Sequence, residues 1–204
     1  MKKITSVLST TAAALGVTVA LASPASANAP SEYVPWLQSA AAQCSGISAS
    51  LLAAQIQAES DFRTNVVSSA GAVGPAQFMP GTWATWGVDA DGDGRADPRS
   101  IPDSVTAQGR FMCHLYSQTS AGVRNGTLRG DPLDLALAAY NAGLGAVQRA
   151  GGMPSGGEYT TQTQPYVAKI KAFEPRYRSL NGPTTTLPQV NAGLDFGSLE
   201  GLFF

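Results

Sequence analysis

The chain after its first 30 residues contains no run of alternating polar and apolar residues, which is the pattern that a half-buried strand requires. It consists of short segments with helical spacing, separated by Gly, Pro, Ser and Asp. Ser48 and the pair Asp131-Pro132 are typical of the residues that begin helices. The pattern predicts a compact all-α domain over residues 33–180. The expected helices cover residues 35–43, 49–60, 83–86, 104–118, 132–140, 144–150 and 165–173.

The two ends of the chain differ from this helical region. Lys2 and Lys3 precede an uncharged apolar run at 12–21, and small residues near 25–29 offer cleavage sites. We interpret residues 1–27 as a signal peptide that is removed, because the apolar run is too short for a membrane span; a retained anchor is the alternative. No second long apolar run follows, so we expect a secreted, extracellular protein without a membrane anchor after processing. Residues 181–204 are linker-like in composition and are expected to form a C-terminal tail.

Charge excludes two classes of partner. Without the two lysines of the signal, 11 basic residues face 14 acidic ones, a net charge of −3, and only 13% of the chain is charged. Nucleic acids and anionic lipids require clustered Lys and Arg, which are absent from the sequence. A neutral, hydroxyl-rich ligand such as a glycan is compatible with this composition.

The two cysteines, Cys44 and Cys113, indicate a single disulfide, because an exported chain folds in an oxidising compartment. Two buried free thiols are the alternative. His114 is the only histidine and has no cluster of possible metal ligands around it in the sequence, so a histidine metal site or a Ser-His or Cys-His nucleophile is disfavoured.

Glu59 is the strongest candidate for chemistry. It lies at the end of the predicted helix 49–60, on the same face as Leu52 and Ile56. Loss of hydration on an apolar face raises the pKa of a carboxyl group toward the range that a general acid needs. On position alone, however, most glutamates reach water and have no catalytic role.

Three motifs that occur in order change this assessment. They are Glu-Ser-Asp-Phe at 59–62, a Gly-rich segment at 69–83 that leads to Gln-Phe-Met-Pro, and Ala-Tyr-Asn-Ala-Gly at 139–143. In these motifs the sequence resembles the soluble lytic transglycosylases, whose catalytic domain is related to goose-type lysozyme. The resemblance covers roughly residues 33–177. It implies a lysozyme-like fold with Glu59 as the catalyst at the base of a glycan cleft, and peptidoglycan strands as the partner of a monomer in the cell wall.

The resemblance also implies a set of substrate-binding residues. By their own chemistry, Gln77 offers an amide to an N-acetyl group, while Met79 and Trp83 offer apolar surface to a sugar; ordinary core packing explains Met79, Trp83 and Trp86 equally well. A fourth family motif, Glu-Thr-x-x-Tyr, departs from the pattern because Gln162 stands where the Glu is usual, and Glu158 is four residues out of register. The implied substrate-binding residues are Ser60, Gln77, Met79, Tyr140, Asn141 and Tyr166.

One glutamate without a motif-linked second carboxylate suggests a particular reaction. Glycosidases normally use two carboxylates, whereas the family scheme uses one as acid and then as base, and closes a 1,6-anhydromuramic acid ring. We therefore expect cleavage of the β-1,4 bond between N-acetylmuramic acid and N-acetylglucosamine, with no required cofactor. A muramidase that uses water is the nearest alternative, and a non-catalytic wall-binding protein on the same fold is the third.

The segment 89–97 is rich in Asp and Gly and matches part of an EF-hand calcium loop. Position twelve of such a loop is Ser100 instead of Glu, and Asp103 completes a shell only if the loop is longer than usual. A structural calcium ion and a plain surface turn held by Asx hydrogen bonds both remain open. The possible ligands are Asp89, Asp91, Asp93, Arg95 and Asp97.

Overall fold

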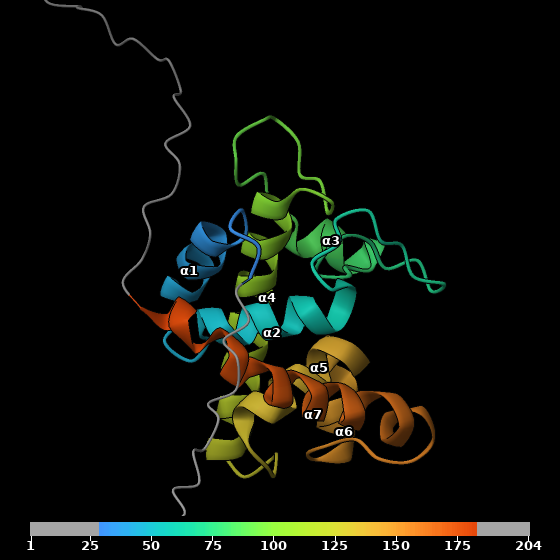
Figure 1. The fold of residues 1–204 in the computed structure, drawn as a ribbon. Coiled ribbons are helices and arrows are strands. Elements are labelled where there is room, and N and C mark those ends of the chain that lie inside the picture. The colour runs from blue at the N-terminus through green and yellow to red at the C-terminus, as the bar shows by residue number, and fades with distance from the viewer. Residues whose placement is uncertain (1–28, 183–204) are drawn as a thin grey trace, which may run out of the picture.

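The computed structural model of the chain describes residues 29–182, so the predicted signal peptide and positions 183–204 of the predicted tail lie outside it. The described part is helical and contains three isolated β-bridges but no strand, in agreement with the predicted all-α class (Figure 1). The elements are α1 (Val34–Ala42), α2 (Ala49–Ser60), α3 (Pro80–Trp86), α4 (Ile101–Arg124), α5 (Pro132–Ala142), α6 (Leu144–Ala150), the π-helix η1 (Tyr159–Thr163), α7 (Gln164–Phe173) and the 3₁₀ helix η2 (Glu174–Asn181).

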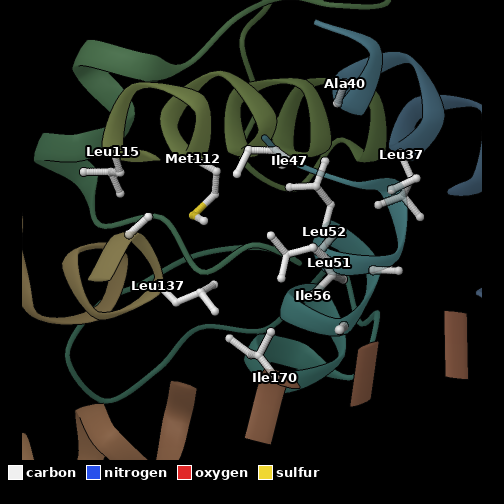
Figure 2. Packing of buried hydrophobic residues seen from close by; sticks show 14 of the residues in the cluster. Leu37, Ala40, Ile47, Leu51, Leu52, Ile56, Met112, Leu115, Leu137 and Ile170 are labelled. Carbon is white, nitrogen blue, oxygen red and sulfur yellow. The ribbon is translucent and has the colours of Figure 1, made fainter. Parts of the chain in front are cut away.

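Helix α2 is the centre of the domain, and it packs against α1, α4, α7 and η2 (Figure 1). The long helix α4 packs against α1 and α5. Buried side chains from four helices meet around α2, as Figure 2 shows. These are Leu51, Leu52 and Ile56 of α2, Met112 and Leu115 of α4, Leu137 of α5 and Ile170 of α7. Within residues 29–182, no helix is both long and apolar enough to cross a bilayer.

The helix boundaries follow local signals where these are strong. Ser48 accepts a hydrogen bond from the Leu51 N–H at 3.1 Å, and Asp131 caps α5 through two backbone N–H groups. Helix α6 has the predicted bounds. Helix α4 is longer than predicted at both ends. Ser100 caps its start, and the helix continues through Gly122 to Arg124. Its Gly109 allows close packing, since a Cβ there would lie 2.7 Å from the Cβ of Ala40.

The predicted disulfide is confirmed. Cys44 and Cys113 are bonded, with their Cα atoms 5.8 Å apart. The bond joins the segment after α1 to the middle of α4, and these two helices also pack directly against each other. The 69-residue separation encloses α2, α3 and the loop between them.

Candidate active site

Glu59 occupies the last turn of α2. The turn that follows is sharp, because Asp61 and Phe62 both have left-handed backbone conformations, with φ of 54° and 61°. Tyr33 fixes this turn by donating its hydroxyl to the Phe62 carbonyl at 2.8 Å, and its ring packs edge-on against Phe62. The end of α2 is therefore held firmly, and with it the position of the Glu59 side chain.

Burial raises the pKa of Glu59 to about 7, although part of the side chain still reaches the surface. Two groups of α7 act in the opposite direction. Tyr166 donates its hydroxyl to Glu59 Oε1 at 2.7 Å, and the positive charge of Lys169 also lowers the pKa. Desolvation exceeds both effects, so the carboxyl group is divided between its acid and base forms near neutral pH. This is the property that the sequence predicted for a general acid.

Two half-buried tyrosines stand beside Glu59. Burial, followed by the Glu59 charge, raises the pKa of both Tyr140 and Tyr166 well above its usual value, so both remain neutral donors. Tyr166 uses its hydrogen on Glu59, whereas Tyr140 donates to the Ala76 carbonyl at 2.8 Å. Tyr140 thus ties the end of α5 to the Gly-rich segment and does not donate to the Glu59 carboxyl group.

A cavity of about 300 Å³ adjoins this cluster. Tyr140 is both a wall of the cavity and a neighbour of Glu59, so it connects the open space to the carboxyl group. The walls come from the Gly-rich segment, α3, α4 and α5, and contain no charged residue. They are Gln77, Phe78, Met79, Thr82, Phe111, Ala139, Tyr140, Asn141, Ala142 and Gly143.

The Gly-rich segment presents Gln77 and Met79 to the cavity. Gln77 has a left-handed backbone (φ 51°), and its side-chain nitrogen donates to the Gly74 carbonyl at 2.8 Å. Its nitrogen therefore holds the loop together, which leaves the amide oxygen as the atom for a ligand. Met79 is 44% exposed, so its apolar side chain is accessible to a ligand in the cavity. Gly74 is required, because it has a φ of 78° and a Cβ there would collide with the Pro98 carbonyl.

Of the other predicted binding residues, Asn141 lies at the cavity and Ser60 does not. Asn141 is exposed in the cavity wall, and its Oδ1 accepts a hydrogen bond from Thr163 at 2.9 Å. Ser60 is not brought to the cavity: it is only 2% exposed, and its hydroxyl donates to the Ile56 carbonyl one turn earlier. The structure therefore corrects the assignment of Ser60, which stabilises the end of α2.

For Trp83 and Trp86, the structure favours core packing over contact with a sugar. Trp83 contacts Phe78 edge-on, and Trp86 contacts Phe111, all in a small cluster beneath the cavity. Phe111, which the sequence analysis did not single out, lines the cavity instead. Of the two tryptophans, neither is a cavity wall.

The comparisons with known proteins agree with this arrangement. A family model described as "Transglycosylase SLT domain" matches residues 37–162, more than half of the chain. This chain belongs to the transglycosylase SLT domain family. The matched region contains Glu59, the Gly-rich segment and Tyr140, while Tyr166 lies four residues beyond it.

Solved structures show the same fold at low identity. A complex of the 70-kDa soluble lytic transglycosylase with bulgecin A has a TM-score of 0.55 and 23% identity, over 79% of this chain and 26% of that one. An inactive mutant of the lytic transglycosylase Slt from Pseudomonas aeruginosa gives 0.54 and 22%, over 76% and 25%. The 70-kDa enzyme from Escherichia coli gives 0.53 and 23%, over 76% and 25%. This chain thus spans about a quarter of the length of these proteins.

The departure of this SLT domain from the fourth motif lies on its surface. Gln162 belongs to η1 and is exposed, as is Glu158. Thr163, next to Gln162, is buried and holds Asn141. The tyrosine of the motif, Tyr166, donates its hydroxyl to Glu59, so this half of the motif contacts the candidate acid directly.

The Asp-rich loop gathers a different set of carboxylates from the one predicted. Oxygen atoms of Asp89, Asp91 and the buried Asp103 lie within 4.8 Å of one another. Asp93 and Asp97 are not part of this group, and each accepts a hydrogen bond from the backbone N–H two residues ahead, at 2.8 and 2.9 Å. Asp89 itself accepts three backbone N–H bonds, which is the arrangement of an Asx turn. Calcium at this loop stays a prediction, with Asp103 in place of Asp93 and Asp97.

We predict that millimolar calcium raises the melting temperature above that in chelator, because the ion binds only where folding brings the three carboxylates together. A free concentration one hundred times the dissociation constant corresponds to about 2.7 kcal/mol. In Asp103→Asn the increment should disappear, whatever the variant's starting stability. Superimposable melting curves with calcium and with chelator would identify the loop as a plain turn.

Proposed function

We propose that this SLT-domain protein is a lytic transglycosylase that cleaves the β-1,4 bond between N-acetylmuramic acid and N-acetylglucosamine in peptidoglycan. The observation that carries the proposal is a single carboxyl group, Glu59, whose pKa is raised to about 7 beside a neutral cavity. No Asp or Glu lines that cavity within residues 29–182. Asp61 follows Glu59 by two residues, but it is exposed and lies beyond the helix end.

One carboxyl group can complete the reaction in two proton transfers. Protonated Glu59 gives its proton to the bridging oxygen as the C1–O bond breaks, and the N-acetyl group of the sugar stabilises the positive centre. The resulting carboxylate takes the proton of the C6 hydroxyl, whose oxygen forms a bond to C1 and closes the 1,6-anhydro ring. Glu59 ends the cycle protonated, and no water is consumed.

A hydrolase requires a different arrangement. A second carboxylate at roughly 5–10 Å from the acid acts as the nucleophile or activates water. The neutral walls of this cavity therefore favour the intramolecular acceptor, which is held on the face of the sugar where Glu59 acts. A non-catalytic wall-binding role is disfavoured, because simple binding does not call for a carboxyl group with so displaced a pKa.

We also infer that the protein works outside the cytoplasm, where its substrate lies. The Cys44–Cys113 disulfide supports this location, since such bonds form and persist in oxidising compartments.

Digestion of purified peptidoglycan should yield muropeptides that end in 1,6-anhydromuramic acid. Because the C6 hydroxyl replaces water as acceptor, each product is lighter by one water than the corresponding lysozyme product. Mass spectrometry of the digest, with a lysozyme digest of the same sacculi as control, measures the difference. Mostly reducing muramic ends would identify a muramidase that retains Glu59 as its acid.

A further inference from the structure

Two glutamines lie in the core directly behind the candidate site. Gln55 of α2 and Gln108 of α4 are each 0% exposed, in helices that both contribute to the apolar core. Gln55 stands one helical turn before Glu59, on the same face of α2. A buried amide without partners costs several kcal/mol, so its presence in a well-packed core needs a reason.

The hydrogen bonds of Gln108 have a fixed direction. Its side-chain nitrogen lies 3.3 Å from the Leu52 carbonyl oxygen and 2.9 Å from Gln55 Oε1. A backbone carbonyl can only accept, so the nitrogen of the Gln108 amide must face α2. Gln55 then has to present its oxygen to Gln108 and its nitrogen to the opposite side.

The nitrogen of Gln55 faces Tyr166. Its Nε2 lies 3.0 Å from Tyr166 Oη, and it also approaches Met112 Sδ at 3.7 Å. The tyrosine hydroxyl has one hydrogen, and it accepts from Gln55, so that hydrogen points to Glu59 Oε1 at 2.7 Å. These hydrogen bonds form a one-way chain in which Gln108, Gln55 and Tyr166 donate in turn and Glu59 is the final acceptor. We call this chain the amide relay.

We propose that Gln55 and Gln108 are positioning residues that hold the Tyr166 hydroxyl as a permanent donor to Glu59 Oε1. The inference rests on the proposed function, in that Glu59 is taken as the acid and base of the reaction. Because Oε1 is always occupied by the tyrosine hydrogen, the transferable proton resides on Oε2. The same oxygen gives that proton to the bridging oxygen and later receives the C6 hydroxyl proton.

The amide relay also affects the pKa of Glu59, which sets the balance between its protonated and ionised forms. Hydrogen bonds in series polarise one another, by roughly 10–30% per bond. Donation from Gln55 therefore makes Tyr166 a stronger donor to the carboxylate. The groups that face Glu59 are Tyr140 of α5 and Tyr166 and Lys169 of α7. Of these, Tyr166 is the group that is hydrogen-bonded to Gln55, and through Gln55 it is linked to Gln108.

A purely structural role is the competing explanation, since the amides also join α2, α4 and α7. Both explanations predict lower stability when a glutamine is replaced. Only the positioning role predicts a change in the ionisation of Glu59, because a structural bond has no reason to act selectively on that carboxyl group. The titration of Glu59 is therefore the measurement that separates them.

The test is a titration of the Glu59 carboxyl carbon by NMR in the full, folded protein labelled at glutamate. Glu59 is one of five glutamates, and its signal is assigned by its loss in Glu59→Gln. Gln55→Met, which is unbranched and of similar size, should raise the pKa of Glu59 by about half a unit. Tyr166→Phe should raise it by about one unit or more, because it removes a bond to a charged group.

The decisive comparison is the double variant. If Gln55 acts through Tyr166, then Gln55→Met should add nothing to the shift once Tyr166→Phe is present. Gln108→Met provides a second route to the same result if Gln55→Met does not fold. Gln38→Met is the matched control: Gln38 is also buried and donates to the Leu180 carbonyl at 3.1 Å, away from the site. It should lose stability and leave the Glu59 titration unchanged.

A Glu59 pKa within 0.1 unit of the wild-type value in both glutamine variants, an interval set by the roughly half-unit shift expected above, would overturn the proposal. So would an equal shift in Gln38→Met, or a shift from Gln55→Met that persists without the Tyr166 hydroxyl. The basic limb of the kcat/KM profile should move with the titration, since that limb reports the free enzyme's acid. The titration needs no substrate, so it can fail or succeed independently of the proposed activity, which is tested by the products and by Glu59→Gln.

Discussion

Glu59→Gln is expected to reduce the initial rate of peptidoglycan cleavage by at least about 10³-fold. General acid–base catalysis is worth roughly 10²- to 10⁴-fold, and in the proposed reaction one group performs both proton transfers. Glutamine has nearly the same shape but neither gives nor takes a proton, so substrate binding at the cavity should persist. Release of soluble muropeptides from purified sacculi measures the rate. Retention of more than a few per cent of the wild-type rate would show that Glu59 is not the catalyst.

Asp61→Asn is the matched control for this substitution. Asp61 is the nearest carboxylate in sequence, but it is exposed and forms the left-handed cap of α2. Asparagine tolerates a left-handed backbone better than most residues, so the turn should survive. The variant should cleave at close to the wild-type rate, which would separate the loss of a specific catalyst from the loss of any acidic group near the helix end.

Stability against pH provides an independent check that Glu59→Gln is folded. The folded pKa of Glu59, about 7, exceeds the ordinary value of 4.5 for a glutamate, so the folded state holds its proton more tightly. Between these values the unfolded wild-type chain binds fewer protons than the folded one, and the free energy of unfolding therefore falls as pH rises. Glutamine carries no charge and escapes this loss. The variant should thus match the wild type near pH 4 and be up to about 3 kcal/mol more stable at pH 8, by urea unfolding.

Local features of the fold could be predicted from the sequence because their causes are local. Ser48 and Asp131 cap helices whatever the rest of the chain does, and a residue period can exclude strands without tertiary information. The packing of α4 is a different case. Gly109 would usually weaken a helix, but tight packing on Ala40 makes it favourable, and only the fold reveals that contact.

The candidate site likewise combines residues with a local sequence signal and contacts that only the tertiary fold creates. Glu59 could be found from its position on an apolar face and its motif, whereas its contact with Tyr166 spans 107 residues and depends on how α7 packs on α2. Gln55 carried a local signal, a glutamine within the apolar run 51–56, but nothing in the sequence pairs it with Gln108. Ser60 shows the reverse error, because a motif residue next to Glu59 in the sequence need not face the cavity.

Removing the disulfide should have a large effect on stability and little on the site's chemistry. In the double variant Cys44→Ala, Cys113→Ala, the unfolded chain regains the freedom of a loop with a 69-residue separation. The chain-entropy description assigns about 4 kcal/mol to such a loop. For a domain of this size that corresponds to a fall in melting temperature of roughly 10 °C. Addition of reductant to the wild type should reproduce the fall, with two thiols titrated only afterwards.

The slope of urea unfolding tests whether this stability arises from the unfolded state. A cross-link keeps the unfolded chain compact, so its removal should expose more surface on unfolding and raise the m-value. If the bond instead acted mainly by holding α1 on α4, the m-value would stay constant. The direct packing of Gly109 on Ala40 joins those helices without the bond, so we expect the fold to persist at low temperature. A variant within about 1 kcal/mol of the wild type, well below the chain-entropy value, would show that the loop holding α2 and Glu59 is constrained by packing alone.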